Sequence, residues 1–154
     1  MASEIQVYKA AALGVGSETN ITSPTDDRPL AKKIRAAWDL NRRAAIREGS
    51  WNFATVLRRL PALNEIPDHS FDHAFKLPAG CLRMLEVFSG GTELGAGEWM
   101  LSEGKILTSA DAPLDVKCLV DVTEPALWDD AFAAAFGQRI AWQIGTSVAG
   151  SSFS

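Results

Sequence analysis

Residues 124–146 read EPALWDDAFAAAFGQRIAWQIGT and decide what kind of fold the chain can adopt. Thr123 is a suitable N-cap and Pro125 fits a first turn, so the segment predicts a helix. Its apolar residues form two stripes at helical spacing. The first stripe is Leu127, Ala131, Ala135 and Trp142, and the second is Phe132, Phe136, Ile140 and Ile144. A helix that is apolar on two sides needs two packing partners, which in so small a domain predicts contact with a neighbouring subunit.

Residues 28–48 form the clearest amphipathic helix upstream. Its apolar side consists of Leu30, Ile34, Ala37, Trp38, Ala44 and Ala45, and its opposite side carries Lys32, Arg35, Arg42, Arg43 and Arg47. Gly49 ends this helix, and Ser50 is a suitable N-cap for a second helix over residues 51–60, which Pro61 stops. In that second helix the inward side chains would be Trp51, Ala54, Leu57 and Leu60. A short helix over residues 3–12 precedes both.

Strand patterns replace helical ones between residues 71 and 122. Residues 71–77 alternate between aromatic or apolar side chains and smaller or charged ones, which predicts a short strand. Residues 82–88 and 114–122 indicate two more strands, and Glu103-Gly104 is typical of a hairpin tip. We therefore expect a small antiparallel sheet in this part of the chain.

These segments together predict a mainly α fold, an antiparallel helical bundle with a small antiparallel β insertion. One domain would cover residues 1–146, helical over 3–60 and 124–146 with the insertion at 71–122. Residues 147–154 are small and polar, which predicts a flexible C-terminal tail.

Charge is distributed unevenly, although the net charge is only −4. Residues 28–59 hold nine basic residues and two acidic ones, a local charge of +7, whereas residues 60–154 hold five basic and thirteen acidic ones, giving −8. The separation fits either a solvated helix face balanced by acidic loops or complementary surfaces that meet in an oligomer.

The cellular setting is suggested by what the sequence lacks. No run approaches the roughly 20 apolar residues of a membrane span, and the first residues do not follow a secretory pattern. The only cysteines, Cys81 and Cys118, are far apart in the sequence. We therefore expect a reducing compartment, a cytoplasmic origin and no disulfide framework.

Catalysis is the weaker interpretation of this sequence. The one metal-like group, His69, His73 and Cys81, lies on the approach to a strand with poor geometry and no fourth ligand. No nucleophile stands in a pattern with a base and an orienting group. We expect no enzymatic activity, no metal and no cofactor. The basic helix leaves one binding alternative open, a small cytoplasmic nucleic-acid-binding module, although the pI of 5.1 disfavours it.

Four blocks of sequence then follow one another in a familiar order. They are GSWNFATVLRRL (49–60), FDHAFKLPAGCLRMLEV (71–87), WMLSEGKILTS (99–109) and LDVKCLVDVTEPALWDDAFAAAFGQRIAWQI (114–144). In their order and spacing the chain resembles, over residues 3–146, the head-to-tail adaptor or tail tubular protein A family of short-tailed bacteriophages and related prophages. Two departures are Gly80, where a polar residue is expected, and a C-terminal arm shorter than in many relatives.

The resemblance implies a structural protein of the virion, made in the cytoplasm of a bacterial host. Such an adaptor would be a monomer when free and a dodecameric ring on the portal protein, with its far side offered to the tail nozzle or tail tube protein. Genomic DNA would pass through its channel without sequence-specific binding, and no membrane would be involved. Opposite charge in the two halves of the chain suits head-to-tail contacts around a closed ring.

Two sets of residues are candidate contacts of such a subunit. The candidate subunit interface is Phe132, Phe136, Ile140, Ile144, Arg42, Arg43 and Arg47. The candidate portal-binding tail, implied by the resemblance, is Gly145, Thr146, Ser147, Val148 and Phe153. The Phe and Ile stripe could instead close over the β insertion, and Phe136→Asp would separate these two possibilities.

Overall fold

The computed structural model describes residues 2–17, 20–68 and 70–153, with side chains described up to residue 145. The chain divides into two compact units. The first comprises Met1–Phe53 and Asp121–Ser154, and the second, Ala54–Val120, is inserted between its two parts. No helix within the described ranges is both long and apolar enough to cross a membrane.

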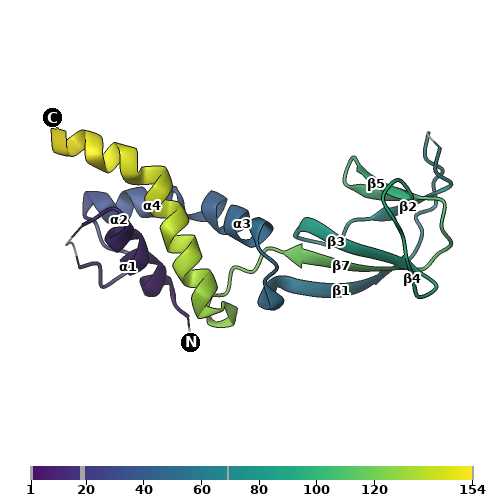
Figure 1. Ribbon diagram of the computed structural model, residues 1–154, viewed down its shortest axis with the longest axis horizontal. Coiled ribbons are helices and arrows are strands. Elements are labelled where there is room, and N and C mark those ends of the chain that lie inside the picture. The colour runs from purple at the N-terminus through teal and green to yellow at the C-terminus, as the bar shows by residue number, and fades with distance from the viewer. Residues whose placement is uncertain (1, 18–19, 69, 154) are drawn as a thin grey trace. The chain divides into compact units, whose positions relative to one another are not determined.

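The first unit is helical. It contains α1 (Glu4–Gly14), α2 (Pro29–Ala36), α3 (Trp38–Glu48) and α4 (Asp130–Phe153), and α4 packs against the other three (Figure 1). Ser3 begins α1 with a capping box, in which its hydroxyl accepts from the Gln6 backbone and the Gln6 side chain accepts from Ser3. A 3₁₀ turn, η2 (Pro125–Leu127), precedes α4.

Close contact between α1 and α4 depends on glycine. A Cβ added at Gly137 would lie 2.5 Å from the Cβ of Ala10, and one added at Gly14 would lie 2.6 Å from the Cβ of Ala141. The two helices therefore approach through small residues, and larger side chains at these positions would force them apart.

The second unit contains seven strands among the described residues. They are β1 (Thr55–Leu60), β2 (His73–Lys76), β3 (Cys81–Ser89), β4 (Thr92–Glu93), β5 (Trp99–Ser102), β6 (Lys105–Thr108) and β7 (Leu114–Val120). They form two antiparallel sheets, ordered β1-β7-β3-β4 and β2-β6-β5. Side chains from both sheets share one buried core of Phe75, Val87, Ile106, Leu114 and Val116.

The expected fold class, mainly α, is wrong. The structure is 37% helical and 26% strand, a mixed fold whose described residues form four helices and two antiparallel sheets of four and three strands. The main cause is residues 51–60, which form a short 3₁₀ turn, η1 (Asn52–Ala54), followed by strand β1 instead of a helix. Thr55 and Val56 are β-branched, and pairing with β7 over the whole of β1 outweighs the weak helical pattern. Leu57, expected to face inward, is 73% exposed.

The other predicted helices and strands differ less from the structure in their boundaries. Ala37 divides the long basic helix into α2 and α3, and the helix expected from residue 124 begins at Asp130 after η2 and continues to Phe153. The strands expected at 71–77, 82–88 and 114–122 are confirmed as β2, β3 and β7. The hairpin tip is confirmed as well, because Glu103 and Gly104 have φ values of 52° and 75°, the left-handed pair that a two-residue turn requires.

Candidate interaction surfaces

One face of α4 is buried in an aromatic cluster within the first unit. Phe132, Phe136 and Ile140 have no exposed surface, and Ile144 is nearly buried as well. The Phe136 ring centroid lies 4.7 Å from that of Trp38, and the Phe132 centroid lies 4.9 Å from that of Phe53. The cluster also includes Tyr8, Trp51 and Trp128. The Phe and Ile stripe is therefore occupied by the chain's own core.

The opposite side of α4, which we call the outer face, is uncharged and open. It consists of Ala131, Ala134, Ala135, Gln138 and Trp142, which share one helical stripe. Trp142 is 83% exposed, whereas most tryptophans in folded proteins bury the greater part of their surface. Leu127, in the turn before α4, is also mostly exposed. Exposed tryptophan beside small apolar residues is typical of protein contact surfaces.

Arg42 is a structural residue in the first unit. Its side chain is 7% exposed, and its guanidinium donates to Asp121 at 2.9 Å (from Nε) and 3.0 Å (from Nη2) and to Asp39 at 2.6 Å. Hydrogen bonding to Asp121 raises the pKa of Arg42 further, against the opposing effect of burial. This bidentate pair ties α3 to the segment that leads into α4. Arg42 is thus not a surface cation, whereas Arg43 and Arg47 are exposed on α3.

Other cations of the basic run are also paired within the chain. Arg35 donates to the backbone carbonyls of Pro24 and Asp26 at 2.6 and 2.8 Å. Arg28 forms an ion pair with Asp26, whose pKa falls to about 2 because of the hydrogen bonds from Arg28. The basic surface is therefore smaller than the local charge of +7 suggests, which weakens the nucleic-acid-binding alternative.

The candidate portal-binding residues lie along the end of α4. Gly145 is half-buried, and a Cβ built on it would meet no atom within 4 Å. The side chains of Thr146, Ser147, Val148 and Phe153 lie outside the described residues, although their backbone continues the helix to Phe153.

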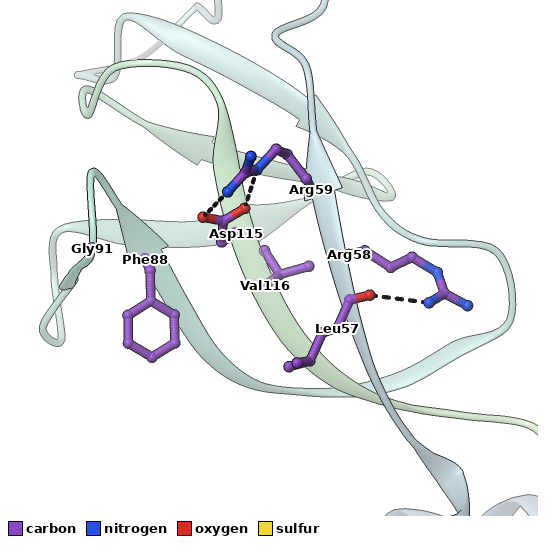
Figure 2. A pocket seen from close by; sticks show the side chains of 7 residues that line it. All are labelled: Leu57, Arg58, Arg59, Phe88, Gly91, Asp115 and Val116. Atoms are coloured by element: carbon purple, nitrogen blue, oxygen red, sulfur yellow. Dashed lines mark hydrogen bonds and ion pairs between the residues drawn. The ribbon is translucent and has the colours of Figure 1, made fainter.

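The second unit contains a hollow on its four-stranded sheet, with a volume of about 570 Å³ (Figure 2). The residues that line it are Leu57, Arg58, Arg59, Phe88, Gly91, Asp115 and Val116. Arg59 Nε donates to Asp115 at 2.7 Å, and this ion pair holds the pKa of Asp115 below its usual value. Asp115 and Arg59 neutralise each other, and Arg58, which donates to the Leu57 carbonyl at 3.0 Å, adds one positive charge to the otherwise apolar lining.

The metal-like group does not assemble among the residues that the structure describes. His73 begins β2 and Cys81 begins β3, and no cluster of three possible ligands occurs in the described ranges. His69 lies outside those ranges. Cys81 instead lies beside Cys118, a juxtaposition that the sequence separation did not suggest.

No protein-family model matches the chain, and no curated protein matches it.

The sequence shows both apolar stripes of α4. The stripe expected to contact a neighbouring subunit, Phe132, Phe136, Ile140 and Ile144, is instead buried in the core of the first unit. The available signal was side-chain size, because the Phe and Ile stripe carries far more apolar area than the alanine stripe and gains more from burial in the chain's own core. The bonding of Arg42 to Asp121 and the hollow in the second unit had no local signal, since each joins residues distant in the sequence.

Proposed function

We propose that this chain is a head-to-tail adaptor of a tailed bacteriophage, a structural subunit that joins the portal to the tail in a ring around the DNA channel. The proposal rests on two supports. The first is the order and spacing of the four sequence blocks that resemble the tail tubular protein A family. The second is the outer face of α4, which provides a surface for a second copy of the chain.

The observation that carries the proposal is the exposure of Trp142. The inner face of α4 already completes the core of the first unit, so the outer face is surplus to the needs of a single copy. A ring subunit requires such a surface, because each copy must contact two neighbours through different patches. Alanines 131, 134 and 135 would let a neighbouring helix approach closely, and Trp142 would supply most of the buried area.

Charge is consistent with a channel protein. The chain has a net charge of −4, and several of its arginines are engaged by its own carboxylates and carbonyls. Each arginine engaged in this way is less available to phosphate, and non-specific affinity for DNA grows with each phosphate neutralised. Low affinity would let DNA slide past the ring. The protein partners of the ring would be the portal and the tail nozzle or tail tube protein.

The test is assembly on a purified portal protein from the phage or prophage that encodes the chain. The purified chain is mixed with that portal, and the mass of the complex is measured by native mass spectrometry or light scattering. We expect a high-mass ring complex for the wild type and none for Trp142→Ser. Ile66→Ser is the matched control, because Ile66 is 84% exposed but lies in the second unit, and it should assemble normally.

Two outcomes would each contradict a different part of the proposal. Failure of the wild type to bind the portal would remove the adaptor function. Normal assembly of Trp142→Ser would leave the function standing and exclude the outer face of α4 as the subunit contact.

A further inference from the structure

The two cysteines of the chain meet on neighbouring strands of the second unit. In the register of β3 and β7, which lie side by side in Figure 1, Cys81 pairs with Val120 and Met84 pairs with Cys118. Cys118 is two residues from Val120 on β7, so it lies on the same face of the sheet as Cys81. A side-chain hydrogen bond joins the two thiols. The register shift between Cys81 and Arg83 is the local irregularity that accompanies this approach.

The two thiols differ in their exposure and acidity. Cys81 is partly buried at the start of β3, whereas Cys118 has no exposed surface. Burial, followed by the effect of neighbouring Cys81, raises the pKa of Cys118 to about 12. An external reagent therefore meets Cys81 first, and Cys118 can react only with a partner already held beside it.

We propose that Cys81 and Cys118 form a reversible cross-strand disulfide when the chain meets a small-molecule disulfide such as oxidised glutathione. The Cys81 thiolate attacks one sulfur of the reagent, and the S–S bond of the reagent breaks to release one glutathione thiolate. The Cys118 thiol then gives its proton to solvent and attacks the Cys81 sulfur, which releases the second glutathione thiolate. The two protein thiols are oxidised by two electrons, and one glutathione disulfide is reduced to two thiols.

The bond would close the loop from Cys81 to Cys118, which contains β4, β5 and β6. Closing a loop of this length restricts the unfolded chain far more than it changes two strands that are already paired. The oxidised second unit should therefore resist unfolding better than the reduced one. The structure has no disulfide between the two cysteines, so it describes the chain before this oxidation.

The test uses the whole chain, reduced and then exposed to oxidised glutathione at pH 8.5. We expect a monomer lighter by two hydrogens, with neither thiol open to a maleimide and a thermal midpoint several degrees higher than before oxidation. Reduction with dithiothreitol should restore both the mass and the midpoint. The second step should accelerate about tenfold per pH unit below the pKa of Cys118, since it follows the thiolate fraction.

Two variants separate this scheme from adventitious oxidation. Cys118→Ser should stop at one bound glutathione, and Cys81→Ser should acquire none in the folded state because its remaining thiol is buried. A wild-type chain that keeps one or two glutathiones, or that forms only disulfide-linked dimers, would overturn the proposal. So would a disulfide that forms only after the chain is unfolded in urea.

Discussion

The two faces of α4 both carry apolar side chains, but one face is buried and the other is exposed. The inner face carries Phe132, Phe136 and Ile140, all without exposed surface, whereas the outer face carries three alanines and a Trp142 that is mostly exposed. What separates them is side-chain size along the whole stripe, because a row of large side chains buries more area than alanines with one large terminal residue. The comparison shows that the core takes the bulkier stripe and leaves the smaller one exposed to solvent.

The largest loss of stability is expected from Phe136→Asp on the inner face of α4. Removing a buried phenyl ring costs about 3–5 kcal/mol, and a carboxyl left without a partner in that site adds to the loss. We expect the first unit to lose its cooperative unfolding transition in urea, followed by circular dichroism. Ala134→Asp on the outer face is the matched control and should change the unfolding free energy by less than about 0.5 kcal/mol. Equal stability of the two variants would refute the assignment of the faces.

A smaller loss is expected from Gly137→Leu, which fills the crossing of α1 and α4. The first added atom already lies 2.5 Å from the Cβ of Ala10 and 3.0 Å from the carbonyl oxygen of Val7, so the helices must separate. Overpacking of this kind costs about 1–3 kcal/mol, measured as a lower urea midpoint. Gly145→Leu is the control in the same helix, since a Cβ there meets no atom within 4 Å. It should be neutral or slightly stabilising, because glycine is a poor helix former.

Asp121→Asn tests how firmly the segment before α4 is tied to α3. The change removes the charge that accepts two hydrogen bonds from Arg42, whose side chain is nearly buried, and should cost about 1–2 kcal/mol of unfolding free energy. Asp39→Asn removes the other carboxylate bound to Arg42, but that side chain is 70% exposed and the loss should stay below about 0.5 kcal/mol. Equal losses of unfolding free energy in the two variants would contradict the assignment of Asp121 as the main partner of Arg42.

The smallest effect on stability is expected from Trp142→Ser. Its indole is mostly exposed, so the unfolding free energy should change by less than about 0.5 kcal/mol. Differential scanning calorimetry of the free chain provides the measurement. A loss above about 1 kcal/mol would show that the outer face contributes to the fold of a single copy, and the contrast between the two faces would then disappear.

Local signals accounted for the parts of the fold that could be predicted. The Glu103-Gly104 hairpin follows from two adjacent residues that accept positive φ, β2 follows from the alternation of its side chains, and β3 and β7 follow from extended, largely apolar runs. Strand β1 could not be predicted in the same way. It is set by pairing with β7, which lies at the other end of the inserted segment in the sequence. The helical preference of residues 55–60 is weak, and pairing with a strand distant in the sequence outweighs it.

The candidate contact residues show the same limit. Arg42 and Arg43 are neighbours of the same type on one helix, yet one is buried and the other is exposed. Asp121, almost eighty positions further along the chain, makes the difference, and no helical wheel contains it. Similarly, the contact between Cys81 and Cys118 follows from the pairing of β3 with β7, which neither cysteine's surroundings in the sequence reveal.

The insertion of the second unit between α3 and α4 also sets an order of events during synthesis. All of the strands of that unit leave the ribosome before α4 does, so it can fold while the first unit still lacks its longest helix. The ring faces that Trp38 and Phe53 present to α4 stay uncovered until Phe136 and Phe132 arrive. During translation of residues 54–130 the nascent chain therefore carries this apolar surface uncovered, and uncovered apolar surface favours aggregation.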